Sequence, residues 1–422
     1  MLRFAPSQTE DIDLENLRVA LFHHILSKTQ NEELIIRIED TQKEKNIENK
    51  DKEILELLAL FSIDYSRVVY QSENIKYHTQ MAMKLLLDKK AFNCFCSDEA
   101  LAQDKEIAEK ENKPYAYSGF CETISDETKF NCNAPFIVRI KKPENTVTFT
   151  DLLQGEKSYE PLEVDSFKIL NHDKSPTASF AAAVDDMLFD ISTIVSQEKD
   201  ILKTPQQKHI RSSLGYEKEI NSLHLAPLID ANYSVQSLVE KGYLPAAIAN
   251  YLILLSYETS QEIFTIEDII KDFDISKIIQ TPEKFEIERL NLINREYMRL
   301  LEDMRFSKII GFADDDIGKL AKLYIEESNT TKEIQEKVKA VFSEKKSLEN
   351  FEDELQAVKE CLKKAPFIKE FEDLQTYLIK HTQLENETLT KVLNFAITGS
   401  TDKQNLHKIY PLIQNYLGEI IK

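Results

Sequence analysis

The first thirty residues constrain the fold of this chain more than any other segment. Leu2 and Phe4 mark a short apolar strand, and a Pro-Ser-Gln-Thr turn follows at residues 6–9. The apolar positions of residues 14–25 then repeat with the period of a helix. A strand, a turn and a helix in this order present the N–H groups of a helix N-terminus, which suit an anion or a nucleotide. The segment predicts the opening of a nucleotide-binding α/β domain.

Composition restricts the classes of function. A chain of 422 residues with 42% hydrophobic residues should form two to four packed domains. Its net charge of -20 excludes a global basic field, so any RNA binding must use local basic patches or shape contacts. We see no signal peptide and no apolar run of membrane-spanning length. Five cysteines are few for this length and fit a reducing compartment, so we expect a cytoplasmic protein without membrane contact.

The pattern of elements changes along the chain. Residues 1–87 alternate strands and helices, and the same alternation resumes at residues 184–230. Between them, residues 88–183 hold clustered cysteines and short strand-like runs, which indicates an inserted α+β module. Beyond residue 231 the pattern is helical nearly throughout.

Several separate motifs, in the same order, resemble those of bacterial glutamyl-tRNA synthetases. A series of collinear motifs is far more specific than any one of them. The resemblance weakens past about residue 300. The matching stretches, with the motif of the family in brackets, are residues 3–9 (RFAPSPT), 36–41 (LRIEDTD), 71–73 (RQSER), 91–96 (AYYCFC), 202–207 (SNTPRQ), 224–229 (HLPLIL) and 242–255 (EGYLPEALLNYLALLG).

The resemblance implies a class I synthetase architecture. An α/β Rossmann-like catalytic domain would comprise residues 1–87 and 184–230, split by an acceptor-stem-binding insertion at residues 88–183 that carries the cysteines. All-α domains would follow, the first contacting the tRNA stem at residues 231–310 and the second resembling an anticodon-binding domain at residues 311–422.

Both ATP-binding signatures of that family are missing. Where the resemblance places the HIGH motif, the chain reads Asp13-Leu14-Glu15-Asn16. A carboxylate there repels a triphosphate, and Glu15 stands where a glycine would let the adenine approach the backbone. The KMSKR loop, whose lysines neutralise the departing pyrophosphate, has no counterpart, and Lys218 is the only Lys or Arg between Arg211 and Lys241. The sequence therefore argues against ATP binding.

The glutamate pocket is retained only in part. The resemblance implies that Arg3 could pair with a carboxylate and Glu39 with an ammonium group. However, Ala178 replaces a pocket tyrosine, and Ser196 replaces the arginine of the VIRGED motif. An alternative is that Arg3 and Glu39 form a buried ion pair that serves only the fold. The positions that bind the amino acid in the family are Arg3, Ala5, Ser7 and Glu39.

The clustered cysteines predict a metal site. Cys94 and Cys96 form a C-x-C pair, and Cys121 follows four residues after Tyr117, which resembles the zinc site of the family. Three thiolates suit Zn²⁺, which takes a fourth ligand, here Tyr117 as the first choice and Cys132 as the second. We expect a structural zinc; the alternative is three free cysteines.

Three functional hypotheses follow. The leading one is a degenerate paralogue, a pseudoenzyme that keeps the synthetase fold, has lost or impaired glutamate activation, and binds tRNA or a partner such as an active synthetase. The second is an active glutamate–tRNA ligase with an altered ATP site. The third is a protein-interaction scaffold without an RNA role. For the second, the cations that could replace the missing motifs are Arg18, Lys28, Lys199 and Lys203.

Overall fold

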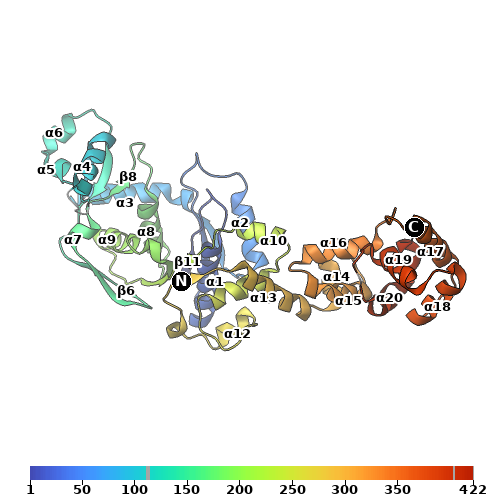
Figure 1. The fold of residues 1–422 in the computed structure, drawn as a ribbon. Helices are drawn as coiled ribbons and strands as arrows, with labels where there is room; N and C mark the ends of the chain where they lie inside the picture. Colours follow the sequence, from blue (N-terminus) through green and yellow to red (C-terminus); the bar gives the residue numbers. More distant parts are fainter. Residues whose placement is uncertain (111–114, 403, 422) are drawn as a thin grey trace. The chain divides into compact units, whose positions relative to one another are not determined.

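The computed structural model describes residues 1–110, 115–402 and 404–421. The chain divides into two compact units (Figure 1). Unit 1 comprises Met1–Gln236 and Ala249–Phe285, and unit 2 comprises Ser237–Ile248 and Glu286–Lys422. None of the helices in the described part of the chain is long and apolar enough to cross a membrane.

Unit 1 is built on a seven-stranded sheet with the strand order β3-β2-β1-β9-β10-β6-β7. All neighbouring strands are parallel except β6 and β7, which form an antiparallel pair. The parallel core confirms the predicted α/β Rossmann-like fold, and the first two strands lie where the apolar runs predicted them. The strands are β1 (Leu2–Phe4), β2 (Leu34–Ile38), β3 (Arg67–Tyr70), β6 (Val147–Asp151), β7 (Gly155–Tyr159), β9 (Thr193–Gln197) and β10 (Asn221–Leu225).

A second, three-stranded sheet with the order β4-β5-β8 is antiparallel and lies beside the cysteines. Its strands are β4 (Ala91–Cys94), β5 (Ile137–Ile140) and β8 (Lys168–Leu170), and a short parallel pair joins β11 (Leu228–Ile229) to β12 (Glu283–Lys284). Although β6 and β7 fall inside the insertion expected at residues 88–183, they pair with the larger sheet. The division of the chain into four domains stays a prediction.

The helices of unit 1 cover both sheets. The first of them, α1, is buried over most of its length, and Asp13 caps its N-terminus by accepting a hydrogen bond from the Asn16 N–H. The helices are α1 (Leu14–Gln30), α2 (Lys50–Leu60), α3 (Ile75–Leu87), α4 (Asp98–Lys110), α5 (Phe120–Thr123), α6 (Asp126–Asn131), α7 (Pro161–Val164), α8 (Ala178–Leu188), α9 (Lys203–Ser213) and α12 (Ile266–Lys271); α10 (Val235–Glu240) and α11 (Pro245–Leu254) pass from one unit to the other.

Unit 2 is helical, as the sequence predicted, around one apolar core that runs from Met298 to Ile421. A close approach between α14 and α15 depends on Gly318, because a Cβ atom at this position would collide with the backbone of Asp303. The helices of the unit are α13 (Ile287–Leu300), α14 (Asp303–Ile309), α15 (Asp315–Leu323), α16 (Thr331–Phe342), α17 (Glu352–Lys364), α18 (Phe371–Thr382), α19 (Asn386–Thr398), α20 (Leu406–Ile413) and α21 (Leu417–Ile420).

Candidate functional site

Glu15 ties the start of α1 to the connection after β10. Its Oε1 accepts a hydrogen bond of 2.9 Å from the backbone N–H of Leu228. The same carboxylate lies 3.8 Å from Arg18 Nη2 and 3.6 Å from Lys199 Nζ. Glu15 therefore has a side chain that is hydrogen-bonded to the protein itself, at the position where the resemblance implies a glycine.

Arg18, one turn further along α1, is also held by groups of the protein itself. It is 2% exposed, donates from Nη2 to the Ala226 carbonyl at 2.6 Å, and donates from Nη1 to the Ser256 hydroxyl at 3.3 Å. Burial lowers the pKa of Arg18 to about 10, although the charges of Glu15 and Asp13 oppose that shift. Its side chain thus has structural partners and is not available to a ligand.

The segment that follows β11 lies against the residues that replace the expected nucleotide motif. The Val235 N–H donates to the Ile12 carbonyl at 3.2 Å, and Asp13 and Ser234 form an antiparallel bridge. Asp230 turns the chain with a φ of 59°. The short connection is thereby held on the N-terminal side of α1, as expected if the lysine-bearing loop of the family has no counterpart in this chain.

The other three candidate cations have internal partners as well. Lys28 pairs with Asp64 at 2.8 Å, Lys203 pairs with Asp200 at 2.6 Å, and Lys199 faces Glu15. The three lysine side chains are exposed, so each pair contributes little to stability, but each lowers the positive charge that a triphosphate would meet.

Three of the four residues proposed for a glutamate pocket line one cavity. Arg3, Ala5 and Glu39 surround a space of about 210 Å³ at the ends of β1 and β2. The fourth, Ser7, forms a bridge beside Glu39, and its hydroxyl lies 2.8 Å from that of Thr9. Ser196 and Ala178 also line the cavity, so the two replaced pocket positions do face it.

The alternative that Arg3 and Glu39 pair with each other is wrong. Arg3 Nε donates to the buried carboxylate of Asp186 at 3.0 Å, and Glu39 Oε1 lies 3.2 Å from Arg37 Nη2. The register explains the difference, because Arg3 is opposite Ile35 in the parallel pair of β1 and β2. Glu39 is four residues further along, which is roughly 13 Å at 3.3 Å per residue.

Asp186 is the centre of a buried charge network. Its Oδ1 accepts from Arg37 Nη1 at 2.6 Å as well as from Arg3. Burial would raise the pKa of Asp186, but the charges of Arg3 and Arg37 hold it well below its usual range. Arg3 is consequently oriented by the fold at the wall of the cavity.

Arg211 lines the cavity and belongs to none of the recognised motifs. It lies on α9, is 5% exposed, and its Nη1 has no hydrogen-bond partner among the described residues. Burial lowers its pKa. Thr204 and Gln207 line the cavity with it. Their spacing of i, i+3 and i+7 places all three side chains on one helical face, and this polar stripe was the available signal.

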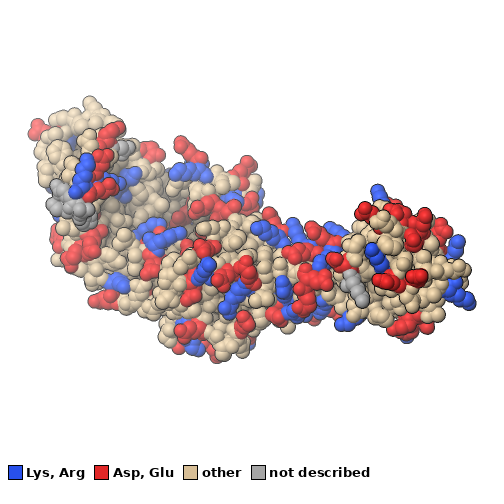
Figure 2. Space-filling model, viewed as in Figure 1, with Lys and Arg blue, Asp and Glu red and all other residues tan. Residues whose placement is uncertain are grey.

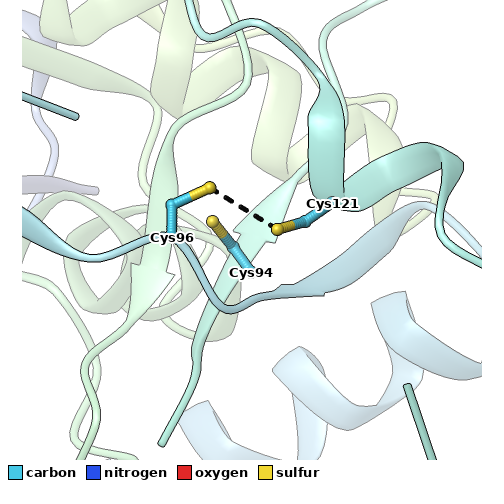
Figure 3. A group of neighbouring side chains, drawn as sticks. All are labelled: Cys94, Cys96 and Cys121. Atoms are coloured by element: carbon cyan, nitrogen blue, oxygen red, sulfur yellow. Dashed lines mark hydrogen bonds between the residues drawn. The ribbon is translucent and has the colours of Figure 1, made fainter. Parts of the chain in front are cut away.

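Cys94, Cys96 and Cys121 come together (Figure 3), and Tyr117 lies beside them. The Tyr117 hydroxyl lies 3.4 Å from the sulfurs of Cys94 and Cys96, and the Cys96 and Cys121 sulfurs are 3.5 Å apart. Burial alone would raise the pKa of the Cys94 thiol, yet hydrogen bonding to Tyr117 and the charge of Arg139 lower it.

A zinc ion fits this group. Zn–S bonds of about 2.3 Å and a Zn–O bond of about 2.0 Å give a tetrahedron with S···S edges of roughly 3.8 Å and S···O edges of roughly 3.5 Å. The observed separations are close to both values. Cys132, the second choice for the fourth ligand, is exposed and is not part of the thiol group found among the described residues.

Comparison with known proteins shows a consistent likeness over the whole chain. A family model described as tRNA synthetases class I (E and Q), catalytic domain, matches residues 1–292. "Glutamate--tRNA ligase 2" of Sulfurimonas denitrificans is 44% identical over all of both chains, and "Glutamate--tRNA ligase 1" of Campylobacter jejuni (strain NCTC 11168) is 43% identical, also over all of both chains.

Solved structures show the same fold. A glutamate tRNA ligase from Elizabethkingia meningosepticum, crystallised in complex with its amino acid, superposes with a TM-score of 0.79 at 19% identity, covering 100% of this chain and 98% of that one. A glutamate-tRNA synthetase from Elizabethkingia anophelis gives a TM-score of 0.78 at 20% identity.

The two sequence alignments above span 432 positions, ten more than the residues of this chain, so this chain lacks about ten residues that those relatives have.

Proposed function

The chain belongs to the class I tRNA synthetases for glutamate and glutamine, and on that premise we propose that it is a degenerate member that binds tRNA without activating glutamate. The observation that carries the proposal is the hydrogen bond from the Leu228 N–H to Glu15. A carboxylate and a backbone N–H of the protein itself thus meet where the resemblance implies a nucleotide-binding motif. The connection after β11 is too short to carry a lysine loop.

Negative charge develops on the departing pyrophosphate when ATP activates glutamate. Adenylate formation requires fixed positive groups at the developing charge, and loss of one such donor typically lowers the rate by about 100- to 1000-fold. Here Asp13 and Glu15 add negative charge, and the candidate cations are paired internally.

The tRNA part of the proposal rests on the family and on the retained fold. The face in Figure 2 shows basic and acidic side chains interspersed over the surface. With a net charge of -20, binding must therefore come from local basic contacts and shape, and it should weaken steeply with salt. A partner protein such as an active synthetase, and a cytoplasmic location, stay predictions.

A second candidate function is an active glutamate–tRNA ligase with an altered ATP site. It is favoured by the identity of 44% to a protein named as such a ligase and by the retained cavity at Arg3. Under this alternative, Lys199 and Lys203 would leave their acidic partners to contact the triphosphate.

ATP–pyrophosphate exchange with glutamate, with and without tRNA, decides between the two. The matched control is the Campylobacter jejuni relative under the same conditions. We expect no exchange above background and no ATP binding by calorimetry. Exchange at a rate comparable to the control would refute the proposal. A gel shift with total tRNA at low and high salt tests tRNA binding separately, and its absence would favour the scaffold hypothesis.

The proposal includes a structural zinc held by Cys94, Cys96, Cys121 and Tyr117. Bound zinc would fix β4 to the helix that begins after Gly119, and it would not enter the reaction. Elemental analysis should find one zinc per chain, lost in Cys94→Ser and retained in the control Cys132→Ser, whose thiol is exposed. A wild-type protein that contains no zinc, and whose stability does not change when zinc is added, would contradict the proposed zinc site.

A further inference from the structure

We propose that Arg139 is a positioning residue of the zinc site: it stacks on the ring of Tyr117, holds the Tyr117 hydroxyl beside the sulfurs, and so makes Tyr117 the fourth ligand. The inference rests on the zinc site proposed above and adds a residue outside the ligand set. Arg139 lies on β5 and belongs to none of the motifs that carry the family resemblance.

The pairing of β4 with β5 places Arg139 on the same face of the three-stranded sheet as the Cys94 side chain. In this antiparallel pair Arg139 is opposite Phe92, and Ile137 is opposite Cys94. Alternate residues of a strand share a face, so these four side chains point to the same side of the sheet. Phe92, Cys94 and Ile137 accordingly belong to one buried cluster with Tyr117. The register of two short strands therefore brings Arg139 to the cysteine group.

Arg139 contacts the ring of Tyr117 directly. Its guanidinium carbon lies 4.4 Å from the centre of that ring, and the Phe92 ring is stacked on the same tyrosine with a centroid separation of 6.0 Å. Arg139 is 9% exposed and Tyr117 is 7% exposed. A cation is attracted to an aromatic face most strongly when both groups are desolvated. These contacts fix the plane of the ring and hence the direction of its hydroxyl, which lies 3.4 Å from the sulfurs of Cys94 and Cys96.

The fold by itself compensates the charge of Arg139 poorly. Its Nη1 donates to the Ser166 carbonyl at 3.0 Å, and its Nε has no acceptor among the described residues. In the described part of the chain, no carboxylate lies within 4.0 Å of the guanidinium. Asp165, next to Ser166, lies beyond that distance and accepts a hydrogen bond of 2.8 Å from the Tyr117 N–H. A buried cation with so few partners is unfavourable unless another anionic group lies close by.

Metal binding supplies that anionic group. Cysteines bind zinc as thiolates, so three of them around Zn²⁺ leave one net negative charge. Arg139 is the buried cation whose charge acts on the Cys94 thiol. One side chain thereby orients Tyr117 and compensates the charge of the thiolates. Groups just outside a ligand set commonly act in this way, because they orient the ligands and raise the affinity for the metal.

Zinc affinity of the full chain, measured by competition with a chelator, tests the inference in a double-mutant cycle. Arg139→Met should weaken zinc binding by about 10- to 100-fold, as the loss of such an outer partner typically does. In the background of Tyr117→Phe, which keeps the ring and removes the oxygen ligand, the same change should cost only about two- to threefold. The matched control is Lys174→Met, which removes another cation stacked on a ring, that of Phe136, and should bind zinc as the wild type does.

Cobalt(II) in the same site gives a second readout, because its visible spectrum depends on the type and geometry of the ligands. We expect Arg139→Met and Tyr117→Phe to change the spectrum in the same direction, since both disturb the oxygen ligand. An equal loss of zinc affinity in both backgrounds, with an unchanged cobalt spectrum, indicates a loosened fold and would overturn the inference. Should Arg139→Met not fold, Arg139→Lys, which keeps the charge and loses the planar stack, is expected to weaken zinc binding several-fold.

The wild-type protein separates this inference from the zinc site on which it rests. Absence of zinc binding by the wild type overturns both. Zinc binding that does not depend on Arg139 overturns the inference alone and leaves the zinc site in place. Neither result alters the expectation for ATP–pyrophosphate exchange.

Discussion

Replacing Glu15 by alanine tests most directly whether the expected nucleotide position has become part of the fold. The substitution removes the acceptor of the Leu228 N–H and the carboxylate nearest to the buried Arg18. The lost hydrogen bond is worth about 1–1.5 kcal/mol. Without the Glu15 carboxylate, the buried charge of Arg18 is less well compensated, which costs about 1–2 kcal/mol. This cost is lower than that of breaking a fully buried ion pair, because Glu15 is 17% exposed and lies 3.8 Å from Arg18. Its place in the first turn of α1 adds about 0.3–1 kcal/mol.

Together these contributions predict a destabilisation of about 2–4 kcal/mol. For a chain of this size we expect a fall in the unfolding temperature of roughly 4–8 °C, since each kcal/mol shifts it by about 2 °C. Glu15→Gln keeps an oxygen for the Leu228 N–H and loses only the charge, so its fall should be about half as large. Differential scanning calorimetry of the full chain measures both, with the exposed Glu10→Ala as the control.

The outcome also bears on function. If Glu15→Ala melts within about 1 °C of the wild type, the carboxylate does not hold the segment at Leu228, and the main argument for a closed ATP site fails. If the variant melts lower but gains ATP-dependent pyrophosphate exchange, the missing lysine loop is not needed, and the active-ligase alternative is favoured. We expect lower stability and no exchange.

Three further substitutions test the energetics of the two units. Asp186→Asn leaves Arg37 without its closest carboxylate and should lower the free energy of unfolding by about 3–5 kcal/mol at pH 7, measured with a denaturant. The pKa of Asp186 is depressed in the folded state. The stabilisation by its carboxylate is therefore present above the unfolded pKa of about 4 and is lost as the pH falls through the folded pKa. Lys345 is 4% exposed, and burial together with the charge of Lys359 lowers its pKa to about 8. Between about pH 8 and 10.5 the unfolded chain therefore binds more protons than the folded chain, so the free energy of unfolding should rise with pH in this range. Lys345→Met should abolish that rise. Gly318→Ala should destabilise unit 2 by about 3 kcal/mol or more, whereas the control Gly418→Ala, with open space around it, should be neutral or slightly stabilising.

The sequence predicted those features that depend on local patterns. The segment at residues 34–38 forms a strand with the same bounds, because four of its five residues are apolar and three of these are isoleucines, which favour a buried parallel strand. The C-x-C spacing and the position of Tyr117 likewise predicted the group of Cys94, Cys96 and Cys121. Each of these signals lies within about thirty residues of sequence.

Contacts between distant segments were not predictable in the same way. Arg3 and Asp186 are 183 positions apart, and Glu15 and Leu228 are 213 positions apart. Their pairing depends on the strand order and on the register of β1 with β2, neither of which a single sequence specifies. The incorrect pairing of Arg3 with Glu39 arose because both were assigned to one pocket without a register to separate them along the strands.

Retention of a residue from a family motif is not by itself evidence of catalysis. Arg3 and Glu39 match the family motifs, but each has a charged partner within the protein, so their retention is explained by stability. Arg211 belongs to no recognised motif, and the charge of Asp186 acts on it as well. A buried charge that the fold compensates is therefore weak evidence for catalysis, whether or not a family motif includes it.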